Sequence, residues 1–275
     1  MKLTGFVLDG VRHIGRVEGN EIIDLGTADA FYADPETALQ SAGHGTVGLT
    51  GAVLAPAVPV TSRVFCVGIN YRSHAAESKS LAGLEEPKFP MIFGRWEQSL
   101  ITDGESAPVP PNEPGLDWEV ELAVVIGARG WLVSRDSALD HVLGYAAFND
   151  LSARRKQTET PQFTLGKNPD RSGPISLVVT KDETGDPADG WQVRTLVNGT
   201  VMQDASTSDL IHDVPAIIAY ITDTVTLLPG DVIATGTPGG VGAGRNPQVF
   251  LHPGDEVVVE VEKVGSVRTP IVAHE

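Results

Sequence analysis

Cysteine, basic residues and long apolar runs are all scarce in this chain. Cys66 is the only cysteine, so no disulfide can form within the chain, as is usual in a reducing compartment. Lysine and arginine number 20 against 36 aspartates and glutamates, which gives a formal net charge of −16. A surface this acidic repels nucleic acid and anionic membranes, so we expect neither as a partner. An anionic substrate would need a local cation, either a basic side chain or a bound metal.

No apolar run approaches the roughly 20 residues of a membrane-spanning helix. The first 26 residues alternate between apolar and polar side chains, as in a hairpin rather than a signal peptide. We therefore expect a soluble cytoplasmic protein. Because Cys66 lies inside the apolar run 64–69, we expect an inert core thiol rather than a nucleophile.

The chain is rich in turn-forming residues, with 30 glycines and 19 prolines among 275 residues. Strands are predicted at 64–69, 90–93, 120–126, 175–180, 192–197, 231–235 and 256–261. Helices are predicted near 35–39, at 139–143 and at 214–221. This pattern favours a mostly β fold with α+β elements over a regular βαβ alternation. We expect a small N-terminal module over residues 1–60 and a catalytic body over 61–275.

Two glutamates stand where a strand enters the core. In the stretch DWEVELAVVIG, residues 117–127, Glu119 and Glu121 would point to the same face of a strand, about 7 Å apart at Cα. Two like charges on a buried face repel unless a cation lies between them, and their oxygens suit Mg²⁺, Mn²⁺ or Ca²⁺. Asp150 ends another small and apolar run and could complete the site. The alternative is a solvated strand face that carries Asp117, Glu119 and Glu121.

The polar segment NYRSHAAES, residues 70–78, follows an apolar run and places His74 three residues before Glu77. On a helix the two side chains would share a face. They could form a proton-handling pair, or they could lie on a solvated helix start. Arg154 and Gln157 follow Asp150 at about one and two helical turns, so both could point towards the same site.

Together these pieces resemble the fumarylacetoacetate hydrolase family, and within it the bacterial acylpyruvase and 2-hydroxyhepta-2,4-diene-1,7-dioate isomerase group. The matching stretches occur in family order, at 67–77, 117–127, 149–154, 166–168 and 229–242. The resemblance implies a mixed β-sandwich or β-roll fold, usually as a homodimer. It also implies a small-molecule substrate, a 2-oxo acid with a second carbonyl, such as an acylpyruvate.

The resemblance further implies a divalent metal, Mg²⁺ or Mn²⁺, held by Glu119, Glu121 and Asp150, and the same donor set would accept Ca²⁺. It makes His74 the general base that activates water, and Glu77 the residue that orients His74 and stabilises its charged form. The ion would chelate the carboxylate and 2-oxo oxygens and stabilise the enolate that cleavage releases.

Five other residues match family positions in catalysis or substrate contact. Lys167 and Gln157 match residues that stabilise the oxyanion formed by water attack. Arg154 matches a position that supports the substrate carboxylate, and Thr237 matches a hydroxyl that contacts the ligand. Arg95 stands in a segment where many relatives carry lysine, so it keeps the charge but changes its geometry.

The chain departs from some relatives in two places. Val67 occupies a position where some family members have a further acidic metal ligand, which leaves three carboxylates. The stretch 158–166 resembles a short lid or wall, with Phe163 as an apolar contact for the substrate.

We therefore expect a metal-dependent hydrolase that cleaves a C–C bond in an acylpyruvate or related 2,4-dioxo acid. Oxaloacetate decarboxylation, and isomerisation or hydration of unsaturated 2-oxo dioic acids, would use the same enolate-stabilising core. A non-catalytic, metal-stabilised binding domain is the remaining alternative, although such a domain would need neither the His74–Glu77 pair nor Lys167.

Overall fold

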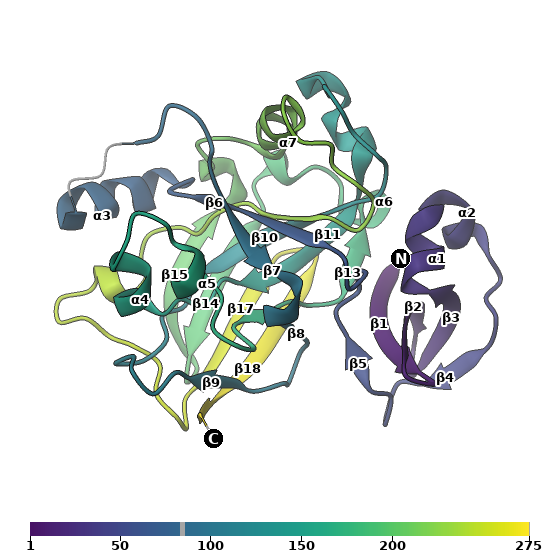
Figure 1. The fold of residues 1–275 in the computed structure, drawn as a ribbon, viewed down its shortest axis with the longest axis horizontal. Coiled ribbons are helices and arrows are strands. Elements are labelled where there is room, and N and C mark those ends of the chain that lie inside the picture. The colour runs from purple at the N-terminus through teal and green to yellow at the C-terminus, as the bar shows by residue number, and fades with distance from the viewer. Residues whose placement is uncertain (83–85, 275) are drawn as a thin grey trace.

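An 11-stranded mixed sheet runs through the molecule in the computed structural model, which describes residues 1–82 and 86–274 (Figure 1). Its strands follow the order β4-β3-β2-β1-β13-β11-β10-β16-β6-β7, and β5 pairs with β1. The bounds are β1 Lys2–Leu8, β2 Val11–Glu18, β3 Glu21–Thr27, β4 Thr46–Gly48, β5 Leu54–Ala55, β6 Arg63–Gly68, β7 Met91–Trp96, β10 Val120–Ile126, β11 Val142–Asn149, β13 Val178–Thr180 and β16 Val232–Ala234.

A five-stranded sheet packs against one face of the large sheet, and a two-stranded ribbon pairs β12 with β8. The five strands follow the order β15-β14-β17-β18-β9. The bounds are β8 Leu100–Ile101, β9 Ala107–Val109, β12 Gly173–Pro174, β14 Gln192–Val197, β15 Thr200–Ser206, β17 Glu256–Val261 and β18 Gly265–Ala273.

The helices are short. The α-helices are α1 Ala28–Ala33, α2 Pro35–Gln40, α3 Arg72–Ala82, α4 Arg154–Thr158, α5 Thr164–Lys167, α6 Lys181–Thr184 and α7 Val214–Thr222. The 3-10 helices are η1 Glu97–Ser99, η2 Arg135–His141, η3 Pro187–Asp189, η4 Thr207–Asp209 and η5 Gly242–Gly244. Within the described chain, none of these helices is long and apolar enough to cross a membrane.

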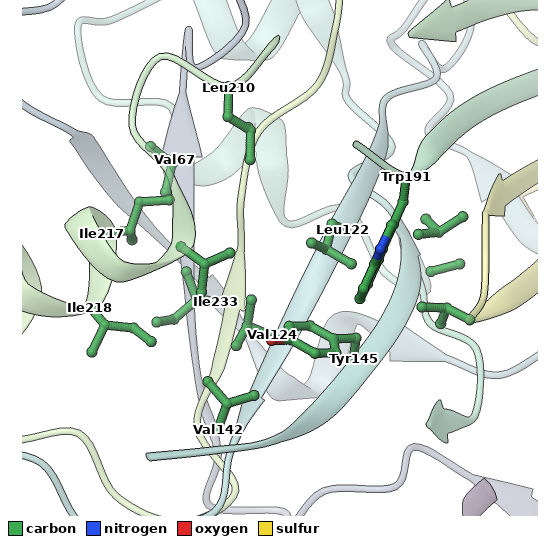
Figure 2. Packing of buried hydrophobic residues seen from close by; sticks show 14 of the residues in the cluster. Val67, Leu122, Val124, Val142, Tyr145, Trp191, Leu210, Ile217, Ile218 and Ile233 are labelled. Carbon is green, nitrogen blue, oxygen red and sulfur yellow. The ribbon is translucent and has the colours of Figure 1, made fainter. Parts of the chain in front are cut away.

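Strand β10 divides the core, because alternate side chains enter different apolar clusters. Leu122 and Val124 pack with Tyr145 and Trp191 beneath the second sheet and α7, as Figure 2 shows. Ala123 and Val125, which point to the opposite face of β10, pack in the second apolar cluster. Both faces of β10 are therefore buried, which explains why its sequence reads as one continuous apolar run.

The predicted elements occur, with one wrong helix. The strands all appear, although β13 is shorter than predicted, and α7 begins after Asp213, whose side chain accepts a hydrogen bond from the Ala216 amide. The helix expected at 139–143 is wrong. The chain instead forms the 3-10 helix η2, and β11 begins at Val142, which pairs with Ile126. The β-branched and aromatic residues that follow fit a buried strand better than a helix.

The first 55 residues form a lobe at one end of the molecule (Figure 1). This lobe is continuous with the body, since β1 pairs with β13 at Leu3 and Val178. Phe31 of α1 also belongs to the same apolar cluster as Cys66 and Phe148. The predicted domain boundary near residue 60 stays a prediction, and the lobe and the body share one core.

Candidate active site

Three carboxylates meet where β10 begins and β11 ends. The two strands are antiparallel, with Val120 opposite Asn149, so Glu119 and Glu121 come next to Asp150. The Asp150 amide donates to the Glu119 carbonyl at 3.0 Å, which fixes this junction. All three side chains are buried, and each offers an oxygen within 4.8 Å of the others. The alternative of a solvated strand face is therefore wrong.

Three basic side chains contact this carboxylate cluster, and Arg95 does so from behind Asp150. Lys167, at the end of α5, places Nζ 2.8 Å from Glu119 Oε2 and 2.7 Å from Asp150 Oδ2. Arg154, at the start of α4, places Nη2 2.7 Å from Glu119 Oε1 and Nε 2.8 Å from Asp117 Oδ2. The described chain offers Glu121 no ion pair; its Oε2 accepts a hydrogen bond from the Gly236 amide at 2.8 Å.

The pKa values of the two glutamates are consequently shifted in opposite directions. Burial alone would raise the pKa of Glu119, but the charges of Lys167 and Arg154 hold that pKa below its usual range. Burial and the nearby charges of Asp150 and Glu119 raise the pKa of Glu121 well above its usual range. Glu121 is thus the carboxyl group whose charged form the described chain does not compensate.

The cluster suits a hard divalent cation. Its donors are all carboxylate oxygens, which Mg²⁺, Mn²⁺ and Ca²⁺ prefer. Such an ion would give Glu121 the positive partner that the described chain does not supply. Glu119, Glu121 and Asp150 are the residues that would hold it.

Helix α3 carries the expected histidine–glutamate pair. His74 Nδ1 lies 3.1 Å from Glu77 Oε2, with both side chains largely buried. The Gly240 amide donates to Glu77 Oε1 at 3.3 Å, and the Gly239 amide donates to Ser73 Oγ at 3.0 Å. The loop after β16 therefore holds the first turns of α3 in place.

A cavity of about 330 Å³ brings most of the predicted site residues together. Its polar lining includes His74, Glu77, Glu119, Glu121, Arg154, Gln157, Lys167 and Thr237. Its apolar lining includes Val67, Ile69, Phe93, Phe163 and Val241. A small molecule in this cavity would contact both the carboxylate cluster and the histidine–glutamate pair.

Hydrogen bonds orient the side chains of Gln157 and Thr237, which both line the cavity. Gln157 Oε1 accepts from Arg154 Nη1 at 2.8 Å, which leaves the Gln157 amide N–H groups as donors. Thr237 Oγ1 accepts from Gln203 Nε2 at 2.9 Å.

Arg95 was expected to contact substrate, but it does not line the cavity. Its side chain is fully buried behind Asp150, and its Nε donates to Asp150 Oδ1 at 2.8 Å. The same guanidinium also donates to Ser172 Oγ and to the Leu151 carbonyl. This position suits a residue that orients Asp150 better than one that binds substrate.

A family model described as "Fumarylacetoacetate (FAA) hydrolase C-terminal" matches residues 63–272. The chain belongs to the fumarylacetoacetate hydrolase family. The human protein named "Oxaloacetate tautomerase FAHD2A, mitochondrial" is 36% identical over 279 residues, covering 94% of this chain and 87% of that protein.

Two solved structures share the fold. A candidate HpcE protein from Mycobacterium smegmatis has a TM-score of 0.88 at 36% identity, covering 100% of both chains. A 2-hydroxyhepta-2,4-diene-1,7-dioate isomerase from Mycobacterium marinum has a TM-score of 0.78 at 30% identity, covering 99% of this chain and 98% of that one. The expected fumarylacetoacetate hydrolase fold is confirmed. The homodimer and the cytoplasmic location stay predictions, and the human relative is named mitochondrial.

Sequence reasoning missed two features of this fumarylacetoacetate hydrolase site. The first is Asp117, a buried carboxylate outside the metal cluster. It accepts from the amides of Gly242 and Ala243 at 2.6 and 2.9 Å and binds Arg154. The second is the contact of the glycine-rich loop with Glu77. The many glycines after residue 235 were a signal for close backbone approach, but nothing in the sequence named the partner.

Proposed function

We propose that this fumarylacetoacetate hydrolase family member hydrolyses a C–C bond in an acylpyruvate or a related 2,4-dioxo acid. One observation carries the proposal. The His74–Glu77 pair lines the same cavity as Lys167 and as Glu119 and Glu121 of the carboxylate cluster. A base beside a site for an anionic oxo acid is what hydrolysis by activated water requires.

Three carboxylates would hold Mg²⁺ or Mn²⁺, which when bound supplies Lewis-acid stabilisation to the carboxylate and 2-oxo oxygens of the substrate. Arg154, one of the lining cations of the described chain, would hold the substrate carboxylate by charge. Arg95 keeps Asp150 in position from behind.

His74 acts as the base in this proposal. In this proposal the Nδ1–H of neutral His74 donates a hydrogen bond to Glu77. The unprotonated Nε2 is then free to take a proton from water. The hydroxide adds to C4 of the substrate, and Lys167 and Gln157 donate to the resulting oxyanion. The C3–C4 bond then breaks, the acyl part leaves as a carboxylic acid, and His74 returns its proton to C3 of the pyruvate enolate. Glu77 stabilises His74 while the imidazole is charged.

The test is pyruvate release from acetylpyruvate, fumarylpyruvate and oxaloacetate with added Mg²⁺ or Mn²⁺. We expect acylpyruvate cleavage to require the metal and to fall about 10²- to 10⁴-fold in His74→Ala. The exposed His252, which does not line the cavity, supplies the matched control His252→Ala, which should keep wild-type activity. Metal-dependent cleavage that persists in His74→Ala would contradict the assigned base.

Keto–enol tautomerisation of oxaloacetate is the second candidate, favoured by the name of the human relative. It would use His74 to move a proton between C3 and the 2-oxo oxygen, with no water consumed. Rapid enzyme-dependent equilibration of the oxaloacetate enol, followed by its absorbance, would support this activity. Absence of pyruvate release from every substrate would exclude hydrolysis. Release of pyruvate from oxaloacetate alone would instead indicate decarboxylation.

A further inference from the structure

The cavity changes from charged to apolar along one wall. Lys167 Nζ lies 5.4 Å from the centre of the Phe93 ring. The Phe93 ring in turn meets the Phe163 ring edge-on, with centroids 5.8 Å apart and an interplanar angle of 82°. Both phenylalanines line the cavity. An aromatic wall formed by Phe93 and Phe163 therefore lies next to Lys167, which contacts the carboxylate cluster.

The positive charges of the lining are engaged at the carboxylate cluster. Arg154 and Lys167 are the lysine and arginine residues that line the cavity in the described chain. Lys167 contacts Glu119 and Asp150. The three guanidinium nitrogens of Arg154 contact Asp117, Glu119 and the Gln157 oxygen. Both cations are therefore already partnered by groups of the chain, and the described lining adds no lysine or arginine at Phe163.

We propose that the site takes 2,4-dioxo acids whose acyl group is uncharged and apolar, and that it discriminates against those with a second carboxylate. This inference rests on the proposed hydrolase function. A carboxylate moved from water to the aromatic wall loses hydration without gaining a free cation as its partner. An apolar acyl chain gains from the same transfer, by about four-fold in kcat/KM for each methylene that the wall covers.

The decisive comparison is between 4-methylpentanoylpyruvate and succinylpyruvate. Their acyl groups have nearly the same shape, and they differ in an isopropyl group or a carboxylate at the end. We expect kcat/KM to be at least about 10-fold higher for 4-methylpentanoylpyruvate. Equal values, or a preference for succinylpyruvate, would overturn the inference and leave the hydrolase function intact.

Variants at Phe163 test whether the aromatic wall is responsible. Phe163→Arg places a cation at the apolar end and should raise kcat/KM for succinylpyruvate about 10-fold while lowering it for 4-methylpentanoylpyruvate. Phe163→Met keeps this wall apolar and should keep the wild-type order of the two substrates. If both variants shift the preference equally, charge at this wall does not set the specificity, and the inference fails.

Binding separates this inference from the proposed chemistry. The dissociation constants of both compounds would be measured by calorimetry on His74→Ala with Mg²⁺, where hydrolysis is removed. Tighter binding of 4-methylpentanoylpyruvate, with no turnover by the wild type, would support the apolar site and refute the hydrolase. Tighter or equal binding of succinylpyruvate would refute the apolar site, whatever the turnover.

Discussion

Glu121 is a buried carboxylate that no lysine or arginine of the described chain pairs with, and its pKa is raised by burial and by its acidic neighbours. Without metal it should cost the fold stability. Glu121→Gln keeps an oxygen for the Gly236 amide and removes the charge. We expect the metal-free variant to be more stable than wild type by about 1–3 kcal/mol, as a higher Tm. Mg²⁺ should then raise that Tm much less than it raises the wild-type Tm.

The same substitution has a pH dependence. Below the usual glutamate pKa the side chain is neutral in both folded and unfolded protein, so the two proteins should differ little. As pH rises, the unfolded wild-type chain loses this proton first, because the folded pKa is raised. The advantage of the variant should therefore grow as the pH rises above the usual glutamate pKa. Glu21→Gln, at an exposed strand position, is the control, and a variant no more stable than that control would contradict the prediction.

At the scale of elements, α3 and the loop that contains η5 hold the His74–Glu77 pair in place. A Cβ added to Gly244 would lie 2.0 Å from Glu77 Oε1, so Gly244→Ala must push that flexible carboxylate away from His74. We expect kcat to fall about 10- to 100-fold, with little loss of stability because only a side-chain end must move. Gly45→Ala, which has open space around the new Cβ, is the control for activity and Tm. Unchanged kcat in Gly244→Ala would show that Glu77 does not need this position.

How far the sequence could predict the site differs between its parts. The spacing of Glu119 and Glu121 on a strand, and of His74 and Glu77 on a helix, reflects local geometry, so short-range patterns predicted that each pair shares a face. Those patterns left a solvated face open, and the family resemblance was needed to favour a site. The contact of Glu77 with Gly240 joins residues 163 positions apart, and it depends on how β16 and α3 pack. The position of Arg95 behind Asp150 also depends on packing, because its sequence shows a charge but not which side of the sheet the charge lies on.

At the scale of the whole molecule, the N-terminal lobe and the body depend on each other. Strand β1 continues the main sheet through β13, and Leu3, Ile14 and Phe31 share an apolar cluster with Val178 of the body. The sequence predicted an N-terminal module from its short strands and the Pro/Ala/Val stretch that follows them. The pairing of β1 with β13 joins strands that are far apart in the chain, so no local pattern could predict it.

Removal of residues 1–60 should therefore expose the apolar face of the body and one edge of its sheet. We expect the 61–275 fragment to aggregate or to lose its cooperative thermal transition, as seen by calorimetry and light scattering beside the full chain. A monodisperse fragment that melts cooperatively and gains stability from Mg²⁺ would show that the body folds alone.

The ammonium group of Lys167, seated between Glu119 and Asp150, has a consequence for the order of events in a cell. A charge supplied by the chain itself already balances part of the acidic cluster, so folding would not have to wait for an ion. Loading then becomes an exchange in which the incoming cation competes with a lysine for shared oxygens. The fraction of loaded enzyme would follow the supply of free magnesium and manganese rather than the rate of protein synthesis.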